Sequence, residues 1–193
     1  MSESGSGKCR CSPSAEASAK RVCCQPKDAE HRETLPSRRP PWVCGVLQTP
    51  VGEVPQLHTA QRLADYLGAC RMRLGIGRMH YRVTPGLYAV GRPTAESPAL
   101  VTANYKLTLD HLRSELGATD AWVLVLDTQG VNVWCAAGKG TFGTDEIVRQ
   151  VAATRLAEVV SHRQLVVPQL GAPGVAAHQV KNRCGFRVIY GPV

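Results

Sequence analysis

Cys135 lies in a short segment whose residue types could hold a soft metal centre. The segment reads Asn132-Val133-Trp134-Cys135-Ala136-Ala137-Gly138-Lys139, and further glycines follow at positions 140 and 143. A thiolate is a soft donor suited to a polarizable metal, and glycines let a ligand approach the backbone closely. Lys139 adds a positive charge near the thiol. The alternative interpretation is a buried, unreactive residue, since free cysteines often serve as small core side chains.

The same glycines do not form a phosphate-binding loop. Such a loop needs Gly five residues before Gly138 and Ser or Thr after Lys139, whereas this chain has Val133 and Gly140 there. Gly75-Ile76-Gly77 is likewise too short a pattern to indicate a dinucleotide site. The chemistry of the segment therefore depends on its cysteine.

A second group of thiols lies near the N-terminus, at Cys9, Cys11, Cys23 and Cys24. Their spacing could bind a soft metal such as Hg(II), but it is neither that of a zinc module nor that of an iron–sulfur site. Incidental thiols in a disordered tail are the alternative. The remaining cysteines, at positions 44, 70 and 184, are predicted to be packing residues.

Charge and polarity limit the classes of function. The formal net charge is +8 over 193 residues, but no nucleic-acid-binding motif accompanies it. The N-terminus has no apolar signal core, and no apolar run reaches the length of a membrane span, so we expect a cytoplasmic protein with reduced thiols. Arg71, Arg73, Arg78 and Arg82 form the densest basic patch, which is either a solvated face or a docking surface for an acidic ferredoxin.

The elements that must position these residues begin near Trp42. Residues 1–41 are rich in Ser, Pro and charge and are predicted to be a disordered tail, and residues 42–193 are predicted to form one domain. We expect helices over about Thr59–Arg73, Thr108–Leu116, Asp145–Val160 and Gly174–Asn182. Leu63, Leu67 and Cys70 share a face of the first helix, and Thr144 is the expected N-cap of the third.

Strands are expected at Ala99–Thr102, Trp122–Leu126, Leu165–Val167 and Phe186–Tyr190, with a hairpin joining Tyr81–Val83 to Leu87–Val90. Alternating strands and helices predict an α/β fold with a Rossmann-like, doubly wound and mostly parallel sheet. Ligands of such sheets bind beyond the carboxyl ends of the strands. Those ends are expected at Ala103-Asn104-Tyr105, Asp127–Thr144, Pro168–Gly174 and Gly191-Pro192.

The octapeptide around Cys135 closely resembles the signature of the mercury-methylating corrinoid proteins, where it forms a cap under the corrin ring. The likeness covers roughly residues 42–193 and includes Leu74–Met79, Tyr81–Val83, Pro85–Gly91, Ala103–Lys106, Gly140–Asp145 and Gln169–Val175. That family is related to the corrinoid iron–sulfur protein of the acetyl-CoA pathway, which has a similar domain but lacks a cysteine in the cap.

The resemblance implies that cobalamin binds with Cys135 as the lower axial cobalt ligand. The further contacts expected with the cofactor are Asn132, Val133, Trp134, Ala136, Ala137, Gly138, Lys139, Thr102, Asn104, Gly171 and Pro192. A thiolate donates electron density to the group bound opposite it, as in thiolate-ligated haem. The implied enzyme is a corrinoid-dependent methyltransferase that passes a cobalt-bound methyl group to Hg(II), with Cys135 as the catalytic residue.

The implied partners are a ferredoxin with two [4Fe–4S] clusters as electron donor and a methyltransferase as methyl source. Full-length members of that family continue into transmembrane helices of the inner membrane, whereas this sequence stops at Val193. We therefore expect cofactor binding to depend less on the membrane part than mercury methylation does. Two alternatives remain: a corrinoid methyl carrier of a one-carbon pathway of the acetyl-CoA type, and a non-catalytic thiol protein that binds soft metals through its tail.

Overall fold

The computed structural model describes residues 40–77 and 81–191, within the unit Arg38–Val193. The four tail cysteines, Arg78 and Pro192 lie outside these residues, as does nearly all of the tail expected at 1–41. The boundary between tail and domain thus stays a prediction. Helices long and apolar enough to cross a membrane are absent from the part of the chain that the structure describes.

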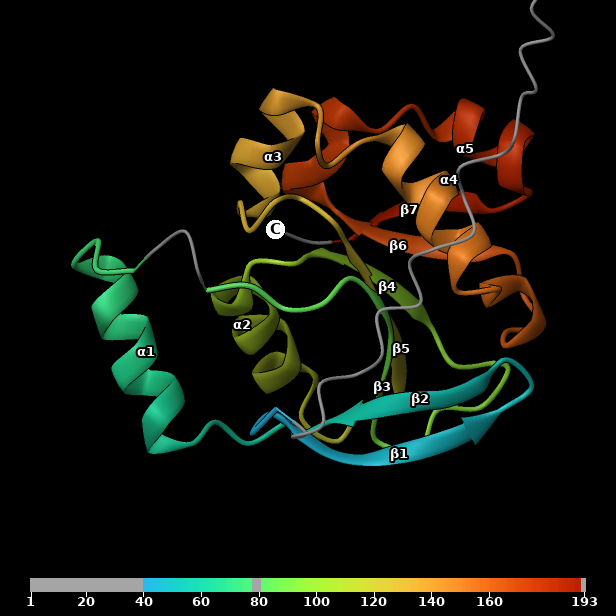
Figure 1. Ribbon diagram of the computed structural model, residues 1–193. Coiled ribbons are helices and arrows are strands. Elements are labelled where there is room, and N and C mark those ends of the chain that lie inside the picture. Colours follow the sequence, from blue (N-terminus) through green and yellow to red (C-terminus); the bar gives the residue numbers. More distant parts are fainter. Residues whose placement is uncertain (1–39, 78–80, 192–193) are drawn as a thin grey trace, which may run out of the picture. The chain divides into compact units, whose positions relative to one another are not determined.

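Seven strands form one mixed sheet in the order β1-β2-β3-β5-β4-β6-β7 (Figure 1). Four neighbouring pairs are parallel, and β1–β2 and β3–β5 are antiparallel. The strands are β1 (Val43–Thr49), β2 (Gly52–Leu57), β3 (Gly86–Val90), β4 (Ala99–Ala103), β5 (Ala121–Leu126), β6 (Gln164–Pro168) and β7 (Arg187–Gly191). The predicted Rossmann-like, mostly parallel α/β sheet is confirmed.

Helices cover both faces of the sheet because its central strand is apolar on both. All six residues of β5 are buried, and Trp122, Leu124 and Leu126 join one core cluster while Val123 and Val125 join the other. The first cluster lies under α3 (Val133–Lys139), α4 (Thr144–Ala153) and α5 (Ala177–Cys184), and the second lies under α2 (Lys106–Leu116) (Figure 1). This two-sided covering is what a continuous apolar run predicts.

The predicted hairpin between Tyr81–Val83 and Leu87–Val90 is wrong. Arg82 forms an isolated antiparallel bridge with Tyr105, and the Val83 N–H donates to the Asn104 carbonyl oxygen at 2.9 Å. β3 pairs with β5 and β2 instead. The β1–β2 hairpin that borders the sheet was not predicted, since β2 contains Pro55, and proline within a run argues against a strand.

All four predicted helices differ from their predicted bounds. Helix α2 begins two residues earlier than expected, and α5 begins three residues later and ends two residues later. The first, α1, spans Leu63–Arg73 and begins four residues later than expected. The long helix expected over Asp145–Val160 ends at Ala153, because Arg155 adopts a left-handed conformation (φ 51°) and a 3-10 turn, η2 (Leu156–Glu158), follows. Its N-cap is Gly143 rather than Thr144.

Candidate functional site

The segment around Cys135 forms a helix, which lies at the carboxyl edge of the parallel strands. Helix α3 follows β5 directly, and its N-cap is Asn132, whose Oδ1 accepts the Cys135 N–H at 2.9 Å. Gly140 ends the helix in the left-handed conformation (φ 78°), which glycine adopts without a steric cost. The octapeptide therefore carries its own start signal, and the glycine that follows it supplies the stop signal.

The two sides of α3 have different chemistry. Val133, Ala136 and Ala137 are buried and pack on the core. Trp134 is 66% exposed, the Cys135 thiol is half-buried, and Gly138 and Lys139 are exposed. Cys135 is thus held by the buried face of a helix that presents its thiol outward.

Asn104, at the end of β4, fixes the loop that leads to α3. Its Oδ1 accepts the backbone N–H groups of Thr128 at 3.1 Å and of Gly130 at 2.9 Å, and it lies 2.9 Å from the Thr128 hydroxyl. Its Nδ2 donates to Asp127 Oδ1 at 3.0 Å. Because Asn104 is only 3% exposed and its amide is engaged on both sides, its role is to position the loop.

Helix α4 holds the same loop from the other side. Glu146 Oε1 accepts the Asp127 N–H at 2.8 Å, and its carboxylate also accepts from Arg149 Nε at 2.7 Å. The hydrogen bond that Arg149 donates to the Glu146 carboxylate, opposed by burial, raises the pKa of the Arg149 guanidinium. The sequence did not predict this role for Glu146. The signal that could have found it is its place in the first turn of α4, because a first-turn carboxylate lies at the same edge as the preceding strand's end.

A 3-10 segment, η3 (Gln169–Gly174), packs against α3 with almost no spare room. A Cβ added at Gly174 would lie 2.2 Å from the Phe142 carbonyl oxygen, and one at Gly171 would lie 2.4 Å from Phe142 Cε1. Phe142 itself is fully buried. These two glycines therefore allow η3 to support α3 and the turn that follows it.

The structure thus divides the predicted site residues into two sets. One set faces outward on α3, and the other lies beneath it as support. The outward set is Asn132, Trp134, Cys135, Gly138 and Lys139, and the supporting set is Val133, Ala136, Ala137, Thr102, Asn104 and Gly171. In the supporting set the side chains of Ala136 and Ala137 pack on the core, so any contact they make with a surface ligand is through backbone.

The outward face of α3 fits a flat ligand with a soft metal at its centre. A Cβ added at Gly138 would meet nothing within 4 Å, so the space at Gly138, about one helical turn beyond Trp134 and Cys135, is open. The thiol is accessible, and no described residue forms a disulfide with it. Groups of three or more His, Cys, Asp or Glu that could chelate an ion alone are absent from residues 40–77 and 81–191. A metal at Cys135 would therefore need most of its ligands from elsewhere, as a macrocycle supplies them.

The Cys135 segment lies within the part of the chain that is similar to known proteins. The family model described as "CO dehydrogenase/acetyl-CoA synthase delta subunit" matches residues 76–193. The gamma subunit of the acetyl-CoA decarbonylase/synthase complex from Archaeoglobus fulgidus is 33% identical over 118 residues, which cover 60% of this chain and 25% of that protein.

Two further relatives have the same name. The subunit from Methanopyrus kandleri is 34% identical over 111 residues (56% of this chain, 24% of the relative), and that from Methanosarcina acetivorans is 33% identical over 115 residues (58% and 24%). The chain spans about a quarter of the length of these relatives. Since the family model matches more than half of its residues, the chain belongs to the family of the CO dehydrogenase/acetyl-CoA synthase delta subunit.

Proposed function

We propose that this domain binds a corrinoid against α3 and serves as a methyl carrier. The observation that carries the proposal is the half-buried Cys135 thiol, presented outward at the carboxyl ends of β4, β5 and β6. This is the edge at which open α/β sheets bind their ligands. A corrinoid, when bound, supplies a cobalt that forms and breaks a bond to a methyl group.

Each residue of the site has a role that follows from its contacts. Cys135 would hold the cobalt of the corrinoid, as a soft thiolate suits a polarizable metal. Asn132 holds the Cys135 backbone, and Asn104 fixes the preceding loop, so the sulfur is kept in place before the ligand arrives. Gly138 leaves room beside the sulfur, while Trp134 and Lys139 offer an apolar ring and a cation to the ligand's periphery.

The comparisons support a carrier of a one-carbon pathway better than they support mercury methylation. Every relative named above is a subunit of the acetyl-CoA decarbonylase/synthase complex, and none of those names refers to mercury. In this proposal the partners are a methyl-donating methyltransferase and a low-potential electron donor such as a ferredoxin. The location we propose is the cytoplasm.

A second candidate, transfer of the methyl group to Hg(II), is favoured by one observation. A thiolate ligand donates electron density to its metal, and a cobalt that Cys135 held would supply a methyl group suited to a soft electrophile. A simple carrier has less need of such a donor than this second candidate has. The two candidates share the cofactor and the site and differ in the acceptor.

The corrinoid proposal is tested by reconstituting the protein with cobalamin and recording its visible spectrum beside that of Cys135→Ala. We expect a base-off, thiolate-ligated spectrum that is lost in the variant. The matched control is Cys184→Ala, which removes a half-buried thiol that donates to Val180 in α5. Identical spectra for the wild type and Cys135→Ala would show that the axial role is wrong.

The acceptor is tested on protein reconstituted with methylcobalamin. Adding Hg(II) should release methylmercury from the wild type and not from Cys135→Ala if the second candidate holds. The quadruple Ala variant of Cys9, Cys11, Cys23 and Cys24 separates Hg(II) capture by the tail from reaction at Cys135. If methylcobalamin bound through Cys135 keeps its methyl group in the presence of Hg(II), the carrier proposal stands and mercury is not the acceptor.

A further inference from the structure

Helix α1 exposes a continuous apolar stripe. Leu63, Tyr66, Leu67, Cys70 and Leu74 follow the i, i+3, i+4, i+7, i+11 spacing of one helical face. Leu63 and Leu74 are each 76% exposed, Leu67 is 58% exposed and Tyr66 is 57% exposed. Apolar residues exposed singly need no explanation, but a contiguous stripe of them indicates an interaction surface.

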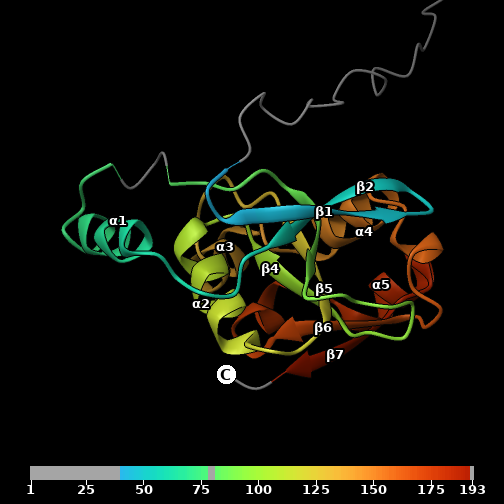
Figure 2. The same cartoon turned by 90° about the horizontal axis from the view of Figure 1, so that it is seen from below.

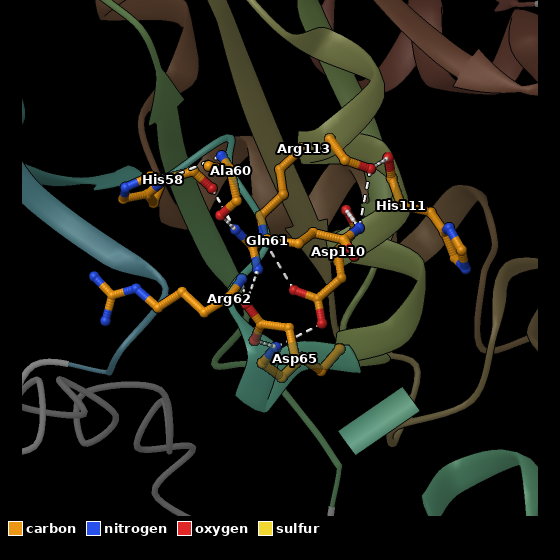
Figure 3. A network of polar contacts seen from close by, with 10 residues as sticks. His58, Ala60, Gln61, Arg62, Asp65, Asp110, His111 and Arg113 are labelled. Carbon is orange, nitrogen blue, oxygen red and sulfur yellow. Dashed lines mark hydrogen bonds and ion pairs between the residues drawn. The ribbon is translucent and has the colours of Figure 1, made fainter. Parts of the chain in front are cut away.

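The opposite face of α1 holds the helix to the domain through charge. Asp65 and Met72 are its buried residues, at 7% and 5% exposure. The Asp65 carboxylate lies 2.8 Å from Lys106 Nζ and 2.7 Å from Arg113 Nη2, and both cations belong to α2. Figure 3 shows Asp65 and Asp110 converging on the Arg113 side chain.

This network fixes which way the stripe points. Burial alone would raise the pKa of Asp65, but hydrogen bonds from Lys106, the Arg62 backbone and Arg113 lower it to about 2, so the carboxylate is charged at neutral pH. Turning the stripe toward the core would separate this charge from Lys106 and Arg113 and leave those cations buried with fewer partners, which is strongly unfavourable. The stripe therefore stays outward, and α1 projects to one side of the domain in both views (Figure 1, Figure 2).

The border of the stripe is positively charged. Arg62, Arg71 and Arg73 are exposed, and at about 100° per residue Arg71 and Arg73 lie on opposite sides of the Leu63–Leu74 line. In Figure 3 the Arg62 guanidinium points away from the buried network. Asp65 is the sole acidic residue between positions 62 and 74, and its charge is already paired. The surface that covers this stripe must thus be apolar at its centre and anionic at its edges.

We propose that α1 docks on an anionic lipid membrane surface, lying in its plane with the apolar stripe at the acyl boundary and the arginines among the headgroups. Interfacial helices have this arrangement, with long cationic side chains reaching up to the headgroups. Exposed Ile76 continues the apolar line past the helix end, which suits a flat surface. The surface is peripheral, since no described helix crosses a membrane.

Other occupants are less well matched. A second copy of the chain would bring its own arginines against these without an acidic residue between them. Residues 1–39 carry more Lys and Arg than Asp and Glu and so offer no anionic complement. The family match begins at residue 76, so α1 lies outside the segment that defines the family. The proposal does not depend on the corrinoid site.

The test is flotation of the whole chain, without cobalamin, with vesicles of phosphatidylcholine alone or with about one third phosphatidylglycerol. We expect binding to the anionic vesicles alone, weakening as salt is added. Leu67→Glu should abolish it. Arg71→Ser with Arg73→Ser should weaken it about 30-fold, because each cation near such a surface contributes roughly a factor of five.

The matched controls are substitutions of the same types at exposed residues outside α1. Ile189→Glu places the same charge on an exposed apolar residue of β7, and Arg92→Ser with Arg187→Ser removes two exposed arginines; both variants should still float. Failure of the wild type to float with anionic vesicles would overturn the proposal in favour of an acidic protein groove. A dimer in light scattering that Leu67→Glu converts to a monomer would overturn it in favour of a second copy.

Discussion

Helices α3 and α1 bury opposite kinds of side chain. α3 turns Val133, Ala136 and Ala137 to the core and leaves a thiol outside, whereas α1 turns the Asp65 carboxylate inward and leaves its leucines outside. α3 is oriented by apolar packing and by Asn132 at its N-cap. α1 is oriented by buried ion pairs.

The difference teaches that what a helix exposes depends on its anchor and not on its apolar count alone. On α3 the apolar face is used to hold the helix, so the exposed face is free for ligand chemistry. On α1 the charged network holds the helix, and the apolar face is left for a partner. Each anchor can be removed separately.

Removing the anchor of α1 should have the largest effect. Asp65→Ala leaves Lys106 and Arg113 with one carboxylate, that of Asp110, between two buried cations, which should cost about 3–5 kcal/mol of unfolding free energy. Urea denaturation measures it. Asp145→Ala, which breaks the exposed pair with Arg183, should cost about 1 kcal/mol or less. Equal losses from the two variants would contradict the assigned role of burial.

Removing the support of α3 should have a somewhat smaller effect. Asn104→Ala leaves the N–H groups of Thr128 and Gly130 without their acceptor, which should cost about 2–3 kcal/mol and weaken cobalamin binding. Asn182→Ala changes an exposed residue of α5 and should stay within about 0.5 kcal/mol of wild type. If Asn104→Ala is destabilised yet binds cobalamin as tightly as the wild type, Asn104 stabilises the fold but does not contribute to cofactor binding.

Acid should loosen α1 before α3. The pKa of Asp65 is about 2 in the folded chain and 3.8 ordinarily, so its contribution is present above pH 3.8 and is lost as pH falls toward 2. The unfolded chain binds the proton more readily, so stability decreases by about 2 kcal/mol over this window. Denaturant midpoints are measured across this pH window for the wild type and Asp65→Asn. The midpoint of the wild type should fall further than that of the variant, because the asparagine does not titrate. Parallel curves would show that Asp65 does not titrate as stated.

The smallest effect is expected at Gly138. A Cβ there meets nothing within 4 Å, so Gly138→Ala should stabilise α3 by about 0.5–1 kcal/mol through helix propensity while weakening cobalamin binding. Gly174→Ala is the contrast, because its Cβ would lie 2.2 Å from the Phe142 oxygen, which should cost about 1–3 kcal/mol. Unchanged cobalamin affinity in Gly138→Ala would show that the ligand does not contact this face of α3.

The sheet and the place of Cys135 could be predicted from the sequence because their signals are local. The run Ala121–Leu126 has no polar residue, and the order of strands and helices then places Asn104 and the Cys135 segment at one edge. Turns that depend on distant partners could not be predicted. The pairing of Arg82 with Tyr105 joins segments separated by two strands, β3 and β4, and Pro85-Gly86 between two apolar runs looked like a local turn.

The orientation of α1 was also beyond the sequence. Leu63, Leu67 and Cys70 do share a face, as expected, but the usual assumption that such a face is buried is wrong here. The decisive residues, Lys106 and Arg113, lie about forty positions further on, and a buried Asp65 cannot be recognised without them. At the site, the supporting role of Glu146 was missed for the same reason.

The hydrogen bonds of Asn104 also change how its loop exchanges with solvent. The amide hydrogens of Thr128 and Gly130 are held by an acceptor that is itself buried, although Asp127 and Gln129 beside them are exposed. Their exchange with deuterium should therefore be slow, because it requires the loop to open and not merely to meet water. The exchange rates of these two amides therefore measure how often the loop that precedes α3 and Cys135 opens.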